Sequence, residues 1–148
     1  MEVAVMAPVP PQGIRVPMLL DGRASAIKLC RSIMIKGMEA MCVQSMLAAK
    51  QFGVDDRVLA SLAASFPGMG WDTGYESYLI GRVVEHGQRR SEEMREAAAM
   101  LDGLGMSSEL ANAIADVQQA LAERPAPLVE ALDEKGRLPQ WRTLLKSA

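Results

Sequence analysis

The chain has 148 residues, of which 49% are hydrophobic but only 4% aromatic, and a formal net charge of −2. This length suits one domain with a core built mainly from aliphatic side chains and methionine. The charge provides neither a basic surface for nucleic acid nor a polybasic patch for anionic lipid, so we expect no nucleic-acid and no membrane partner. The first residues lack the cationic start and uninterrupted apolar run of a signal peptide.

A long helix is predicted from about Gly22 to Phe52. Its polar residues fall within roughly a quarter of the helical circumference, and apolar residues cover most of the rest. This polar stripe consists of Ser25, Lys28, Ser32, Lys36 and Glu39. A helix that is apolar nearly all round is a buried one, and a lysine on it needs solvent, an acidic partner or an anionic ligand. We therefore expect the function at this stripe, with a solvated edge of the domain as the simpler alternative.

Two further features of this helix matter. Gly37 is expected to permit a close helix crossing, and Glu39 to balance Lys36 or Arg31. The cysteines, Cys30 and Cys42, lie roughly 18 Å apart along the helix, too far for a disulfide within the chain. Two cysteines with no others nearby also make no metal cluster. The simplest expectation is therefore that both thiols stay reduced in a cytoplasmic protein.

Turn and capping signals divide the rest of the chain into shorter helices. Asp55 or Asp56 is expected to cap the second helix, and the spacing of Thr73 and Glu76 is that of a capping box. An interruption is expected at His86-Gly87. The predicted helices cover about 22–52, 55–65, 73–85, 89–101 and 108–122, with a short one around Trp141 and a weak helical segment at 128–132.

Four stretches of the sequence resemble one enzyme family. They are Gly22-Arg-Ala-Ser-Ala-Ile-Lys28-Leu-Cys-Arg31-Ser32 with Lys36-Gly37 and Glu39-Ala40, then Ala48-Ala49-Lys-Gln-Phe-Gly53-Val54, Ser65-Phe-Pro67-Gly68-Met-Gly-Trp71, and Glu85-His86-Gly87-Gln-Arg89-Arg90-Ser-Glu-Glu93-Met94. Together they are similar to the C-terminal helical domain of the β-hydroxyacid dehydrogenases, the relatives of 6-phosphogluconate dehydrogenase and 3-hydroxyisobutyrate dehydrogenase. The resemblance is strongest to a phosphogluconate dehydrogenase-like C-terminal domain of unknown function, and covers about residues 22–122.

The resemblance implies an all-α bundle with one long central helix and a short extended N-terminal arm. Residues 1–22 look like the end of the family's dinucleotide-binding domain, and residues 23–148 like its substrate-binding and dimerisation domain. The family holds NAD or NADP at Gly-x-Gly-x-x-Gly between a strand and a helix, and this sequence contains no such unit. Gly103-Leu-Gly105 reads as a helix stop. We therefore expect no cofactor to bind this chain alone, as in a fragment of a longer dehydrogenase.

Family resemblance also implies roles for individual residues. A lysine at the position of Lys28 is the acid/base for the substrate hydroxyl, and an Asn, or His-Asn, one turn later binds the substrate. Arg31 and Ser32 stand in that place here, which departs from the family's pattern. The chemistry needs such a base, because hydride leaves an alcohol carbon as its hydroxyl loses a proton. The expected substrate-binding residues are Ser25, Arg31, Ser32, His86, Arg89 and Arg90.

Simpler interpretations remain for the basic residues near position 90. His86 is the only histidine, and a lone histidine at a helix end is usually no ligand. Arg89 and Arg90, with nearby glutamates, are typical of a solvated face, although the guanidinium fork also suits a carboxylate or phosphate. The sequence thus predicts the substrate and dimerisation half of an NAD(P)-dependent dehydrogenase, a homodimer that takes a small anionic hydroxy acid. The alternative is a non-catalytic helical dimerisation or interaction module.

Overall fold

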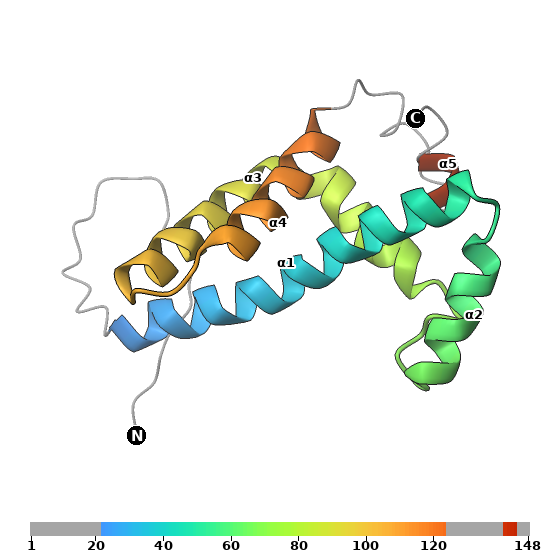
Figure 1. Cartoon of the computed structure of the whole chain (residues 1–148), viewed down its shortest axis with the longest axis horizontal. Helices are drawn as coiled ribbons and strands as arrows, with labels where there is room; N and C mark the ends of the chain where they lie inside the picture. Colours follow the sequence, from blue (N-terminus) through green and yellow to red (C-terminus); the bar gives the residue numbers. More distant parts are fainter. Residues whose placement is uncertain (1–21, 124–140, 145–148) are drawn as a thin grey trace, which may run out of the picture.

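The computed structural model describes residues 22–123 and 141–144, and this part of the chain is all-α, without strands. Its helices are α1 (Gly22–Gln51), α2 (Asp55–Ser65), α3 (Tyr75–Gly103), α4 (Glu109–Ala122) and α5 (Trp141–Leu144). Figure 1 shows α1 running the length of the molecule, with α3 and α4 side by side along it and α2 and α5 at its far end. The expected N-terminal arm and the weak helix at 128–132 lie outside the described residues.

The long helix has the predicted limits. It begins at Gly22 and ends at Gln51, just before Gly53, whose φ of 65° favours glycine. Gly37 is buried against α4, where a Cβ atom would lie 3.3 Å from Ile114 Cδ1. This is the close helix crossing expected for Gly37. No helix among the described residues is long and apolar enough to cross a membrane.

One continuous helix, α3, occupies the segment where an interruption was expected at His86-Gly87. Gly87 is buried at the crossing of α3 with α4. A Cβ atom there would lie 2.6 Å from the backbone oxygen of Gln118 and 3.0 Å from Cβ of Ala122. The predicted break is wrong because this glycine serves the approach of two helices, which the sequence signal does not distinguish from a helix stop.

The predicted N-caps of α2 and α3 are also wrong. The N-cap residues are Val54 and Gly74, and neither makes a side-chain capping hydrogen bond. Thr73 Oγ1 instead donates to a backbone carbonyl three residues earlier, at 3.3 Å. Asp55 accepts a 2.6 Å hydrogen bond from Nε of Arg142 in α5. Thr73 and Asp55 each make a hydrogen bond other than the capping bond that the local sequence rules predict.

Two hydrophobic clusters hold the bundle together. Small side chains dominate the cluster between the middle of α1 and helices α3 and α4, which is Ala40, Met94, Ala97, Ala98, Ala111, Ile114 and Ala115. Larger side chains dominate the other, which is Cys42, Val43, Met46, Leu79, Ile80, Val83, Leu121 and Trp141. Small residues let α3 and α4 pack closely, whereas the wider end is filled by Met46 and Trp141, both fully buried.

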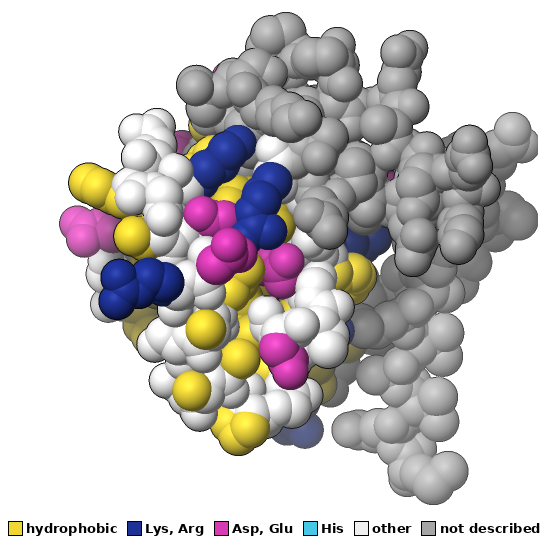
Figure 2. All heavy atoms as spheres, turned by 90° about the vertical axis from the view of Figure 1, so that its right-hand side faces the viewer, with side chains coloured by type: hydrophobic (Ala, Val, Ile, Leu, Met, Phe, Trp, Pro, Cys, Tyr) yellow, Lys and Arg dark blue, Asp and Glu magenta, His cyan; other side chains and the backbone are white. Residues whose placement is uncertain are grey.

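At this wider end the short helix α5 is held by its first two residues. Trp141 inserts into the core, and Arg142 pairs with both Asp55 and Asp56 of α2. Lys50 Nζ donates to the backbone oxygen of Arg142 at 3.4 Å. Figure 2 views this end and shows basic and acidic side chains next to one another, with hydrophobic side chains scattered over the lower part.

Candidate functional site

A cavity of about 430 Å³ opens between α1 and α3. Six basic and two acidic side chains line it: Lys28, Arg31, Lys36, Arg82, Arg89 and Arg90, with Glu39 and Glu93. The chain as a whole carries a net charge of −2, so this cavity concentrates positive charge against the overall balance. Such an environment attracts anions.

Helix α1 contributes most of its polar stripe to this cavity. Lys28, Ser32, Lys36 and Glu39 all line it, because residues three or four apart share one face of a helix and this face is turned toward α3. Ser32, Lys36 and Glu39 are buried, whereas Lys28 is exposed at the start of the row. For the three buried residues the solvated-edge alternative is therefore wrong.

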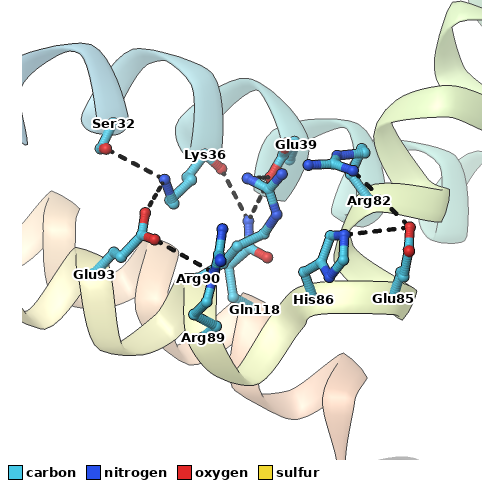
Figure 3. A network of polar contacts seen from close by, with 10 residues as sticks. All are labelled: Ser32, Lys36, Glu39, Arg82, Glu85, His86, Arg89, Arg90, Glu93 and Gln118. Atoms are coloured by element: carbon cyan, nitrogen blue, oxygen red, sulfur yellow. Dashed lines mark hydrogen bonds and ion pairs between the residues drawn. The ribbon is translucent and has the colours of Figure 1, made fainter. Parts of the chain in front are cut away.

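Lys36 is fixed by two partners. Its Nζ lies 2.6 Å from Oε2 of Glu93 and donates a 3.2 Å hydrogen bond to Oγ of Ser32 (Figure 3). Burial would raise the pKa of Glu93, but the hydrogen bond and charge of Lys36, together with the charge of Arg89, hold it below its usual value. Glu93 is therefore a carboxylate, and it neutralises Lys36 in the cavity wall.

A second buried ion pair joins three helices. Arg90 Nη1 of α3 lies 3.0 Å from Oε2 of Glu39 in α1, with 8% and 2% of the two side chains exposed. From α4, Gln118 Nε2 donates to the same oxygen at 3.2 Å and to the backbone oxygen of Lys36 at 3.3 Å. Burial raises the pKa of Glu39 above its usual value, although Arg90 and Gln118 oppose the shift. The pair fixes the floor of the cavity.

Charges remain unpaired at the mouth of the cavity. Lys28 and Arg31 are exposed and make no ion pair within 4 Å in the described part of the chain, although the charge of Lys28 contributes to the lowered pKa of Glu93. Arg89 is 75% exposed and reaches Glu93 only through a 3.5 Å contact, and Arg82 lies 3.9 Å from Glu85. An anion entering the cavity would therefore meet exposed cationic side chains from both α1 and α3.

Five of the seven predicted site residues line this cavity, namely Lys28, Arg31, Ser32, Arg89 and Arg90. Ser25 is exposed on α1 outside the lining. His86 lines a separate hollow on α3, where its Nε2 lies 3.3 Å from Oε2 of Glu85. The structure therefore does not bring Ser25 or His86 to the cavity. The solvated face expected as the simpler interpretation does not hold for Arg90, because Arg90 and its partner Glu39 are both buried.

Several residues of the cavity were not predicted as site residues. Glu39 was expected to balance Lys36 or Arg31, but its ion-pair partner is Arg90. Tyr75 and Tyr78 add two aromatic rings, with centroids 6.2 Å apart and planes 13° from parallel. The sequence shows that the two tyrosines are three residues apart at the start of a helix. It does not show how α3 lies against α1, so the tyrosines could not be assigned to this cavity from the sequence.

Comparisons with known proteins find a matching family and similar solved structures. Residues 49–121 match a family described as a domain of unknown function, DUF1932, a range that runs from the end of α1 into α4 and excludes Lys28 and Arg31. The chain is also similar to the crystal structure of a conserved hypothetical protein from Sinorhizobium meliloti 1021, with 35% identity and a TM-score of 0.66. That similarity covers 76% of this chain but only 36% of the other. A search of curated proteins finds no match.

Proposed function

We propose that this chain is the substrate-binding and dimerisation part of an NAD(P)-dependent β-hydroxyacid dehydrogenase, and that its cavity takes a small hydroxy-acid anion. The observation that carries the proposal is the cavity with an excess of basic side chains and unpaired Lys28 and Arg31 at its mouth. The resemblance of residues 22–122 to the C-terminal bundle of 6-phosphogluconate dehydrogenase supports it. The free thiols of Cys30 and Cys42 suit a cytoplasmic setting.

The basic residues of the cavity differ in the roles open to them. Four of the six are arginines, which stay protonated and can only bind and orient an anion. Of the two lysines, Lys36 is held by Glu93 and Ser32. This leaves Lys28 to exchange a proton with the substrate hydroxyl, and Arg31 with Arg89 to bind the carboxylate.

The described residues do not fit a dinucleotide. The pyrophosphate of NAD or NADP binds at a glycine turn between a strand and a helix N-terminus. Here Gly103 and Gly105 lie at the C-terminal end of α3, and the helix that follows begins with the acidic residue Glu109. A carboxylate at that position repels a phosphate. In the proposal the cofactor is therefore held by another part of a longer protein, and we assign no step to it here.

Calorimetric titration of the chain tests the proposal. We expect 3-hydroxypropionate to bind, and NAD and NADP to give no binding heat. Arg31→Met should weaken the binding of the acid about 10- to 100-fold, because a lost charged hydrogen bond removes about 1.5–3 kcal/mol. Arg57→Met is the matched control, because Arg57 is exposed on α2 outside the cavity. The bound acid should also protect Lys28, and not Lys50, from an amine-reactive reagent. Absence of hydroxy-acid binding, or micromolar affinity for NADP, would contradict the proposal.

Dimerisation is the second part of the proposal. Ile27, Met34 and Met41 are 62%, 69% and 63% exposed and recur every seven residues along α1, as in helices that pair with a second helix. Val43 and Met46, two other apolar residues of α1, are buried within the chain itself. This exposed row is also what favours the alternative of a non-catalytic interaction module, which would dimerise without binding a hydroxy acid.

Sedimentation at micromolar concentration tests the dimer. We expect Met34→Glu to give a monomer, because the added charge would lie in the middle of the row. The control is Met106→Glu, at another exposed methionine, in the loop between α3 and α4. A monomeric wild-type chain that binds no hydrophobic dye would refute this part of the proposal.

A further inference from the structure

A second cavity, of about 420 Å³, lies beside α1, near the end of α2 and the loop that precedes α3. Four methionines line it, together with two aromatic residues: Met38, Met41, Met46, Met69, Phe66 and Trp71. No charged residue belongs to its lining. Burial raises the pKa of the Cys42 thiol in this wall to about 12, so the thiol stays neutral as well. This cavity therefore differs in chemistry from the basic cavity described above.

Met38 lines both cavities. Its side chain is half-buried, and its sulfur accepts a 3.7 Å hydrogen bond from the hydroxyl of Tyr75. The Tyr75 ring lines the basic cavity and meets the ring of Trp71, which lines the apolar one, edge to face at 5.2 Å. The wall between the cavities thus consists of Met38 and this aromatic pair. Methionine is unbranched and changes rotamer readily, so the wall is adaptable.

We infer that the two cavities form one bipartite ligand site, and that the ligand is an amphipathic hydroxy acid. Its carboxylate lies in the basic cavity, and an aromatic group attached to the same molecule lies in the methionine-lined cavity. An aromatic ring suits this lining, because thioether sulfur makes favourable contacts with ring edges and Phe66 and Trp71 add aromatic contacts. This inference rests on the proposed function for its anionic half, and it adds the class of substrate.

A second copy of the chain is the competing occupant of the apolar cavity, and two methionines of the lining separate the cases. Met41 belongs to the exposed row on α1 that we assign to the dimer. Met69 lies in the loop after α2, away from that row, and is 40% exposed, so its replacement leaves the hydrophobic clusters of the core intact. Met69 is therefore the position at which to test the ligand.

The experiment compares two acids that differ by one phenyl group, 3-hydroxyoctanoate and 3-hydroxy-8-phenyloctanoate, by calorimetric titration of the whole chain. The five-carbon spacer is needed because Lys28 and Met38 lie about 15 Å apart along the axis of α1. We expect the phenyl acid to bind about 10-fold tighter or more, which is the gain from burying an aromatic side group. Met69→Gln should remove most of that gain and leave the affinity for 3-hydroxyoctanoate unchanged. Met106→Gln, exposed outside both cavities, should change neither affinity.

Each other outcome overturns the inference in a distinguishable way. Equal affinities for the two acids would remove the apolar half and leave the proposed function standing. If the phenyl acid binds more tightly but Met69→Gln does not change its affinity, the phenyl ring must lie outside the methionine-lined cavity. A change of oligomeric state in Met69→Gln would assign the cavity to a second copy. If neither acid binds, the proposed function fails together with this inference.

Discussion

Two ion-pair clusters lie at different depths of this molecule. Arg90 and Glu39 meet in the interior beside the basic cavity, with 8% and 2% of their side chains exposed. Arg142 and Asp55 meet near the surface at the far end, with 36% and 16% exposed. A buried pair loses much hydration and gains little net stability, but it is costly to break, whereas an exposed pair contributes little in either case. The interior pair is therefore better suited to fixing helix positions than to stabilising the fold.

The pKa shifts of the two carboxylates have opposite directions. Burial raises the pKa of Glu39, because its partners do not fully compensate for lost hydration. The hydrogen bond from Arg142 lowers the pKa of Asp55 and outweighs the opposing effect of burial. Near neutral pH the ionised Glu39 thus opposes folding, and the ionised Asp55 favours it. The comparison can be tested at each cluster.

The largest effect is expected from breaking the interior pair. Arg90→Met leaves Glu39 buried without its counter-charge and should lower the free energy of unfolding by about 3–5 kcal/mol. The double variant Arg90→Met with Glu39→Met should recover much of this loss, because two apolar side chains replace the pair. Urea denaturation near neutral pH measures both. A single variant that loses less than the double would show that the pair does not behave as a buried one.

A smaller effect is expected at the helix crossing that brings Gln118 to the interior pair. Gly87→Ala places a methyl group 2.6 Å from the backbone oxygen of Gln118, so α4 must move away from α3. We expect a loss of about 1–3 kcal/mol, less the small gain that alanine brings within a helix. Gly103→Ala is the control, because a Cβ there meets nothing within 4 Å. Equal stability of the two variants in urea denaturation would contradict the close crossing.

These residues also mark how far the sequence predicts this structure. The limits of α1 and the polar stripe follow from helical periodicity and from Gly53, and the all-α class is confirmed. The partner of Glu39 does not follow, because Arg90 and Gln118 reach it only through the register of three helices. Gly87 shows the limit of local signals, since a glycine for close packing looks like a glycine for a helix stop. The substrate roles remain predictions.

The smallest loss of stability is expected at the surface pair of Arg142 and Asp55. The way this loss depends on pH is its most specific feature. Arg142→Met should lower the free energy of unfolding by about 1 kcal/mol or less at neutral pH. Because the pKa of Asp55 is lower in the folded state, this contribution is present above the ordinary pKa of an aspartate and disappears as the pH falls through the folded value. The wild type and Arg142→Met should therefore converge in acid.

Glu39→Gln should show a pH dependence of stability opposite in sign to that of Arg142→Met. Because the pKa of Glu39 is raised by folding, its ionisation penalty is largest above the folded pKa and vanishes as the pH falls to the ordinary value for a glutamate. As the pH falls toward the ordinary pKa of a glutamate, the wild type should therefore gain stability relative to Glu39→Gln, while its advantage over Arg142→Met stays unchanged. That advantage should be lost only at lower pH, below the ordinary pKa of an aspartate. Urea denaturation curves between neutral pH and the acid limit of folding measure both differences. Parallel pH profiles for the two variants would contradict the distinction between an interior pair that positions helices and a surface pair that holds α5.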